Sequence, residues 1–191
     1  MSTARDALLE KAMAHVAAHG MSDLSLRELA AAIGTSHRML LYHFGSREGL
    51  VAAIVASMEQ TQRDELLSLT EDASSPREVI ERQWAQLTDP TVLPFVALFF
   101  EVLALAVHRR PGTEGFLEGI TDPWLDQATD AAAQLGLEVD RDELRLGVAV
   151  SRGLLIEVLA SGDVQGPTRS LQRFLDLWET GARTGSLPDR K

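Results

Sequence analysis

Residues 22–50 most strongly constrain the fold, because they predict two short helices, a tight turn between them and the start of a third helix. Gly34 supplies a permissive backbone where the first helix ends, and Ser36 is a natural N-cap for the second. Leu40 and Phe44, four residues apart, are expected to point inward. Apolar residues also recur along the first helix at the spacing of one buried face: Leu26, Leu29, Ala30 and Ile33. This geometry lets a short helix stand out from its scaffold and enter the major groove of DNA.

The segment resembles the DNA-binding domain of the TetR family of transcriptional regulators. The resemblance begins with the helix predicted over residues 5–20 and is strongest over residues 24–50, where the run Tyr-His-Phe-Gly-Ser-Arg-Glu occupies residues 42–48. It implies an all-α fold of about nine helices. Residues 1–48 would form a three-helix, helix-turn-helix DNA-binding domain, and residues 49–191 an effector-binding and dimerisation body.

One position departs from the family pattern. The family usually has tyrosine directly after the leucine of the recognition helix, whereas Leu41 holds that position here and the tyrosine is Tyr42. One residue is about 100° of rotation on a helix, which weakens the expectation of a phosphate contact from Tyr42.

The outward positions of the recognition helix supply the candidate DNA contacts. Arg38 is predicted to read a base, because a guanidinium can bind O6 and N7 of guanine together. The resemblance places Arg27 and Arg47 at DNA-contacting positions, and Arg47 also begins a helix, where backbone N–H groups favour phosphate. These arginines could instead be ordinary solvated charges, and His43 could simply pack near the helix end. The full predicted set is Ser25, Arg27, Ser36, His37, Arg38, Tyr42, His43 and Arg47.

The net charge of −10 is unevenly distributed along the chain. Residues 1–50 contain five basic and five acidic residues, so residues 51–191 carry the whole negative charge. Such asymmetry would orient the protein on DNA and disfavour binding through its other end.

A helical period recurs through the rest of the sequence, and no strand pattern is evident. The chain contains no cysteine, which fits a cytoplasmic location, and no apolar run is long enough to cross a membrane. Further helices are predicted over residues 46–69, from Ser75–Pro76 to Asp89–Pro90, and over 91–109, 114–135 with a break near 122–123, 140–161 and 168–184.

Aromatic residues gather in the middle third of the chain. The stretch 95–108 is apolar on every side, which predicts a central helix, and the resemblance implies an effector chamber around it. A filled core is the alternative. Glu101 and Arg152 are charges in otherwise apolar surroundings, so each is expected to reach solvent, pair with the other, contact an effector or lie at a dimer seam. The predicted effector pocket consists of Trp84, Phe95, Phe99, Phe100, Glu101, Trp124 and Arg152.

The last two helices are the predicted dimer interface. The final helix carries an apolar stripe at i, i+3, i+4 and i+7, and the resemblance implies that both helices pack with their symmetry mates into a four-helix bundle. The alternative is that the stripe covers only the core of its own subunit. The predicted interface residues are Gly147, Ser151, Leu155, Val158, Leu171, Phe174, Leu175 and Trp178.

These patterns predict a regulator, most simply a repressor, that binds a pseudo-palindromic operator as a homodimer and is released by a small apolar effector. A DNA-binding regulator without an effector is the second interpretation. An all-helical enzyme is the third, and it lacks support because no catalytic constellation, cofactor motif or metal-ligand set is evident. His15 and His19 have metal-ligand spacing, yet no third ligand accompanies them.

Overall fold

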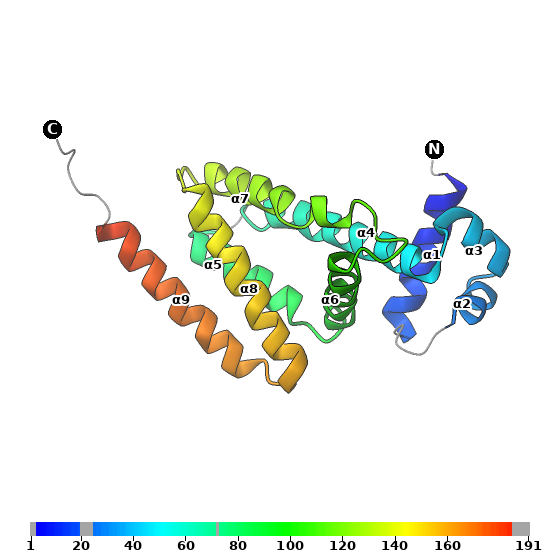
Figure 1. Cartoon of the computed structure of the whole chain (residues 1–191). Helices are drawn as coiled ribbons and strands as arrows, with labels where there is room; N and C mark the ends of the chain where they lie inside the picture. Colours follow the sequence, from blue (N-terminus) through cyan, green and yellow to red (C-terminus); the bar gives the residue numbers. More distant parts are fainter. Residues whose placement is uncertain (1–2, 20–24, 72, 185–191) are drawn as a thin grey trace.

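The structure is a computed structural model that describes residues 3–19, 25–71 and 73–184. Within these residues the chain forms nine α-helices and one short 3₁₀ helix and contains no strand, which confirms the all-α prediction (Figure 1). The helices are α1 (Ala4–His19), α2 (Leu26–Ala32), α3 (His37–Phe44), α4 (Arg47–Ser68), α5 (Pro76–Leu87), α6 (Leu93–Val107), η1 (Phe116–Gly119), α7 (Asp122–Gln134), α8 (Arg141–Ser161) and α9 (Gln165–Thr184).

Side-chain caps set the beginnings of most of these helices. The Ser25 hydroxyl accepts a hydrogen bond from the Glu28 N–H at 3.2 Å, and the Glu28 carboxylate accepts one from the Ser25 N–H at 2.9 Å, which is a complete capping box. Ser36 caps α3 as predicted, and Ser46 caps α4. The turn-and-helix geometry of residues 25–47 is therefore specified locally by its own sequence.

The last helix begins three residues earlier than predicted. Residues 162–166 are expected to form a loop that ends at Pro167, but α9 begins at Gln165. The Asp163 carboxylate accepts hydrogen bonds from the N–H groups of Gln165 and Gly166, at 2.8 and 3.1 Å. These bonds satisfy the first free donors of the helix, and Pro167 fits in a first turn because it has no N–H to leave unpaired.

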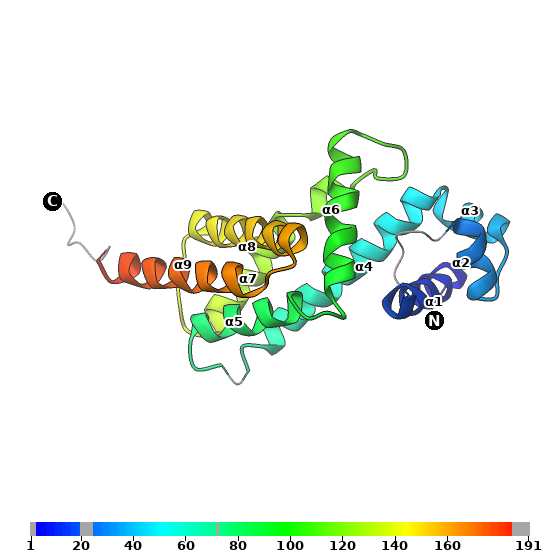
Figure 2. The ribbon, with the colours of Figure 1, turned by 90° about the horizontal axis from the view of Figure 1, so that it is seen from below.

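Helices α1, α2 and α3 form a small head around the beginning of α4. Its core consists of fully buried side chains: Val16, Leu29, Leu40, Leu50 and Ile54. The same cluster continues into α6 through Phe99 and Val102. Helix α4 extends from the head into the larger body formed by α5–α9, where it packs against α6 and α7 (Figures 1 and 2).

Helix α6, which is apolar on every side and predicted to be central, has one exposed face. Phe95, Phe99 and Val102 are buried, but Ala97 and Val107 on the other side are exposed. Helix α6 packs against α4, η1 and α8, and these neighbours leave its outer face uncovered. None of the helices in the described residues is long and apolar enough to cross a membrane.

Candidate DNA-reading head and ligand pocket

The recognition helix α3 exposes the polar residues that the sequence analysis placed outward. Arg38 is exposed, and Tyr42 is 79 % exposed, while Leu40 and Phe44 are buried against the head core. Arg38 and Tyr42 lie four residues apart and therefore share one helix face. His37 is half-buried at the beginning of the same helix, beside its cap Ser36.

Two apolar residues extend this face and were missed by the sequence analysis. Met39 is 41 % exposed and Leu41 37 % exposed. They are the chain neighbours of Leu40, about 100° from it on either side, and so flank the face that Arg38 and Tyr42 share. Apolar side chains in this setting can contact the methyl group of thymine.

The other predicted DNA residues divide into two groups. Arg27 on α2 and Ser25 at its cap are exposed. His43, in contrast, has its Nε2 atom buried and without a hydrogen-bond partner, and its ring lies edge-on to Tyr42 at 5.0 Å. This arrangement favours the packing alternative for His43, and a DNA contact from it stays a prediction.

Arg47 connects the head to the body. Its Nη1 atom lies 3.5 Å from the Oε1 atom of Glu101, and both side chains are partly exposed. The prediction that Glu101 lines the effector pocket is wrong, because Glu101 lies on the outer face of α6 and pairs with the head. A Glu101–Arg152 pair does not form either, since Arg152 hydrogen-bonds to the Ile120 carbonyl.

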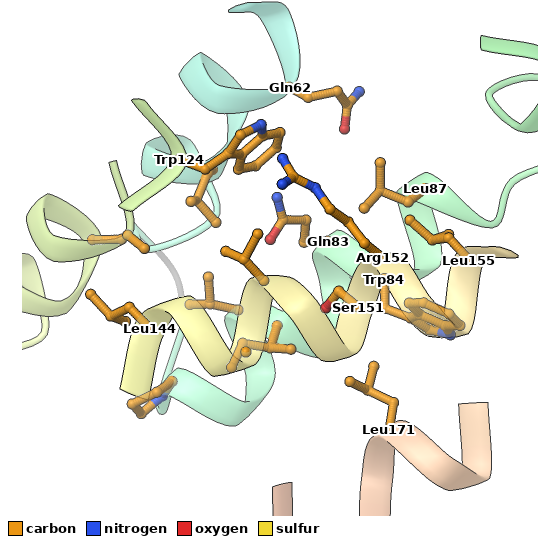
Figure 3. A pocket seen from close by; sticks show the side chains of 18 of the residues that line it. Gln62, Gln83, Trp84, Leu87, Trp124, Leu144, Ser151, Arg152, Leu155 and Leu171 are labelled. Carbon is orange, nitrogen blue, oxygen red and sulfur yellow. The ribbon is translucent and has the colours of Figure 1, made fainter. Parts of the chain in front are cut away.

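The body contains a pocket of about 480 Å³ between α4 and the five helices that follow it (Figure 3). This volume is within the range of small-molecule sites, and mostly apolar walls are typical of them. Six of the seven predicted pocket residues line it: Trp84, Phe95, Phe99, Phe100, Trp124 and Arg152.

One end of the pocket carries buried polar groups from α4, α7 and α8. The indole N–H of Trp124 donates to the Oε2 atom of Glu59 at 2.6 Å. Burial raises the pKa of the Glu59 carboxyl, although Trp124, Arg152 and Arg63 each act in the opposite direction. Burial also lowers the pKa of Arg152, and the Glu59 charge partly offsets this. Figure 3 shows Arg152 extending from α8 toward the side where Trp124 and Gln62 lie.

The sequence analysis missed the contribution of α4 to this polar end. Glu59, Gln62 and Arg63 lie in the uninterrupted polar run of residues 59–65, which is typical of a solvated helix surface. Gln62 and Arg63 are nevertheless only 9 % exposed, because α4 is covered by body helices along this stretch. Their burial depends on tertiary packing and leaves no signal in the local sequence.

Residues 8–54 match the family described as "Bacterial regulatory proteins, tetR family". Over this segment the chain is similar to that family. A curated relative, the HTH-type transcriptional regulator BetI of Agrobacterium fabrum, is 26 % identical over 112 residues, which are 56 % of this chain and 54 % of that protein. The match therefore spans about half the length of this relative.

Solved structures of other proteins share the fold of this chain. A putative transcriptional regulator from Rhodococcus sp. RHA1 is 18 % identical, with a TM-score of 0.71 over 91 % of this chain and 96 % of that one. A putative transcriptional regulator from Saccharomonospora viridis, solved in complex with choline, is 20 % identical, with a TM-score of 0.67 over 91 % and 95 %. The multidrug binding protein EbrR, complexed with ethidium, is 22 % identical, with a TM-score of 0.60 over 88 % and 96 %.

Four of the predicted dimer residues lie in the core of their own subunit. Leu155, Val158, Leu171 and Leu175 are buried in one core cluster, and α8 and α9 lie side by side (Figure 2). The remaining predicted interface residues are half-buried and line the pocket: Gly147, Ser151, Phe174 and Trp178. Contact of α8 and α9 with a second subunit stays a prediction.

A different face of α8 is apolar and exposed. Leu146 is 57 % exposed and Ile156 is 52 % exposed, and small residues lie on the same side of the helix. The whole stripe has alternating spacings of three and four residues, the pattern of a helix–helix seam: Leu146, Ala149, Gly153, Ile156 and Ala160.

The two N-terminal histidines stack on one another, with ring centroids 4.4 Å apart. The Nδ1 atom of His19 lies 3.1 Å from the His15 carbonyl oxygen. Across the part of the chain that the structure describes, no group of three or more His, Asp or Glu side chains is arranged to hold a metal ion.

Proposed function

We propose that this protein is a homodimeric transcriptional repressor in the cytoplasm that binds a pseudo-palindromic operator and is released by a small molecule. Residues 1–48 read the DNA and residues 49–191 bind the effector and dimerise. The observation that carries the proposal is the continuity of α4. This single helix begins at Arg47 in the head, and farther along it supplies Glu59 and Gln62 to the pocket wall.

This continuity gives an effector a physical route to the DNA. A ligand that fits only one spacing of α4 against α6 and α7 would favour the conformations with that spacing. Any tilt of α4 would move the head, because the beginning of the helix packs into the head core through Leu50 and Ile54. The structures of relatives with choline and with ethidium support a ligand-binding body in this fold.

The exposed apolar stripe on α8 supports dimerisation. Leu146 and Ile156 would be buried against a second copy, while Gly153 lets the two backbones approach closely. A two-fold dimer presents two recognition helices to successive major grooves, about 34–36 Å apart along the DNA.

A regulator without an effector is the alternative function. It would require a filled body, whereas this body holds a cavity of about 480 Å³ with buried polar groups at one end. The cavity favours the effector-responsive form.

DNA selection from a random pool tests the reading head. The selected fragments should share two related half-sites, and Arg38→Ala should weaken binding by about 1–3 kcal/mol per half-site and relax one base position. Arg47→Ala should instead weaken binding to all sequences and lower the dependence of affinity on salt. Unchanged affinity and base preference in Arg38→Ala would show that α3 does not read DNA through this face.

Sedimentation tests the dimer. The double variant Leu146→Glu and Ile156→Glu should be a folded monomer that has lost operator binding, because two charges per subunit would be buried in the seam. Leu117→Glu, at a residue of η1 that is 43 % exposed, is the matched control and should remain a dimer. A dimeric double variant would place the interface elsewhere.

A further inference from the structure

The Glu59 carboxylate at the buried end of the pocket lies near two guanidinium groups, of which only that of Arg152 lines the pocket. The Nη1 atom of Arg63 lies 3.8 Å from the Oε2 atom of Glu59, and Arg152 acts on the same carboxylate from farther away. Two guanidinium groups therefore share one carboxylate. The other charged residues that line the pocket do not alter this balance, because Glu138 and Glu143 are exposed and Arg77 pairs with Asp176 and Glu179.

Arg152 has unused hydrogen-bonding capacity toward the cavity. A guanidinium carries five N–H donors in a planar fork, and the Nη2 atom of Arg152 donates to the Ile120 carbonyl. Its Cζ atom lies 5.3 Å from the centroid of the Phe99 ring. No carboxylate of the described residues lies within ion-pair distance of it. A partly buried cation in an apolar cavity is stabilised by an anion that arrives with a ligand.

Gln62, which also lines the pocket, needs a hydrogen-bond donor, whereas Arg152 needs an acceptor. Its Oε1 atom is buried and has no hydrogen-bond partner, and the whole residue is only 9 % exposed. Its Nε2 atom donates to the Oε2 atom of Glu65 at 3.2 Å, which fixes the amide with its oxygen as the free end. A buried acceptor without a donor is unfavourable, so a ligand that brings a hydroxyl or amide N–H to this atom gains affinity.

Most of the remaining wall is apolar and leaves room for a hydrocarbon body, with Gln83 and Ser151 as uncharged polar groups in it. Phe95, Phe99 and Trp84 line one part of the cavity, and Leu171 and Leu155 line another. The indole N–H of Trp84 is already used, since it donates to the Thr168 hydroxyl at 2.8 Å. This part of the pocket therefore selects for apolar surface.

We infer that the effector is an apolar molecule that ends in a carboxylate and carries a hydroxyl group close to that end. The carboxylate binds the guanidinium of Arg152, the hydroxyl donates to the Gln62 Oε1 atom, and the hydrocarbon chain lies along the aromatic walls. This inference rests on the proposed function, because it names the chemical class that the effector pocket accepts.

Four probes of equal chain length test the inference by calorimetry and thermal shift on the full protein without DNA. They are 3-hydroxydecanoate, decanoate, decanol and decyltrimethylammonium. We expect affinity to fall in that order, by about tenfold or more between the two acids and the two other probes. Tighter binding of decanol or of the ammonium compound, or no binding of either acid, would overturn the inference.

Three variants assign the two polar contacts. Arg152→Met should weaken the binding of both acids about ten- to hundredfold and leave decanol unchanged, and Arg152→Lys should recover part of the affinity because it restores the charge without the fork. Gln62→Leu should remove the preference for the hydroxy acid over decanoate, and equal binding of both acids by the unmodified protein would overturn the assignment to Gln62. Arg145→Met, an exposed residue on α8, is the matched control and should bind as the unmodified protein does.

The same probes separate this inference from the proposed function. If the acids bind but the protein selects no DNA, the regulatory function fails and the ligand class stands. If the protein selects an operator but only the cationic probe binds, the ligand class fails and the regulator stands.

Discussion

The head and the body of this protein differ in how tightly they are packed and in where their candidate functional groups lie. The head is solid, with one continuous cluster of buried side chains, and its candidate functional groups, such as Arg38 and Tyr42, lie on the outside. The body is hollow. Two further clusters of buried residues surround its cavity together with the α6 end of the head cluster, and its candidate functional groups, such as Glu59 and Arg152, point inward.

This difference explains how each part can serve its role. A solid head presents α3 in one fixed orientation, which base reading requires, because a hydrogen bond to a base edge depends on both distance and angle. A hollow body lacks contacts that a ligand can supply, so ligand binding can change which of its conformations is populated. The predictions below test whether the two parts differ in this way, from the largest expected effect to the smallest.

Truncation of a core leucine should be more costly in the head than in the body. Leu40 is completely buried in the head, and Leu40→Ala should lower the free energy of unfolding by about 3–5 kcal/mol, because a new cavity is created. Leu144 already faces the pocket, and Leu144→Ala should lower it by only about 2 kcal/mol, since fewer contacts are lost. Urea unfolding of both variants measures the difference. Equal losses would show that the body is as tightly packed as the head.

The loop after α6 should be the most sensitive point between the two parts. Gly112 has φ +89°, and a Cβ atom there would lie 2.8 Å from both the Gly49 N atom and the Ser46 hydroxyl. Gly112→Ala should therefore destabilise the protein by about 2–4 kcal/mol, through left-handed backbone strain and overlap with the first turn of α4.

Gly115→Ala in the same loop is the control for backbone strain alone. Gly115 has φ +76° and open space around its Cα atom, so only about 1–2 kcal/mol should be lost. Melting temperatures of the two variants check the comparison. If the two variants melt together, the loop does not pack against α4 closely enough to transmit a movement of the body.

The sequence predicted the head better than the body for a physical reason. In the head, each helix is begun by its own cap, and a single buried face fixes which residues point outward, so Ser25, Ser36 and Arg38 could be placed from local pattern. His43 was the exception, because the burial of its ring depends on neighbours rather than on spacing.

In the body, the helices have neighbours on more than one side, and spacing alone does not say which neighbour a stripe faces. Leu171 and Leu175 of the α9 stripe were therefore assigned to a partner subunit, although both are buried in the core of their own subunit. Aromatic content still identified the pocket region. The polar residues that complete it, Glu59 and Gln62, could not be found, because their burial results from the packing of body helices against α4.

Glu59 should make the stability of the body fall as the pH rises above about 4.5. Burial raises the pKa of this carboxyl above its ordinary value of 4.5, so the unfolded chain releases the proton at a lower pH than the folded chain does. Between the two pKa values the folded state binds more protons, and the free energy of unfolding decreases with pH. Glu59→Gln keeps an acceptor for the Trp124 N–H and should remove this decrease.

Unfolding experiments at pH 4, 5, 6 and 7 measure the effect as the difference between Glu59→Gln and the unmodified protein. That difference should grow in favour of the variant as the pH rises. A variant that loses stability relative to the unmodified protein at high pH would show that the carboxylate is favourably paired rather than penalised by burial.

The smallest effect on stability is expected at the ion pair between the two parts. Arg47 and Glu101 are partly exposed and 3.5 Å apart, and such pairs contribute about 0–1 kcal/mol. Glu101→Gln should therefore leave the melting temperature nearly unchanged. It should nevertheless tighten DNA binding by up to about fivefold at low salt, because Glu101 competes with phosphate for the guanidinium of Arg47. The gain should fade as salt screens the charges.

Glu71→Gln is the control. It changes the net charge equally but lies in the loop after α4, at the end of that helix away from the head, and it should have no comparable effect. Equal gains from both variants would indicate a general effect of net charge, and the contact between body and head would then have no part in DNA binding.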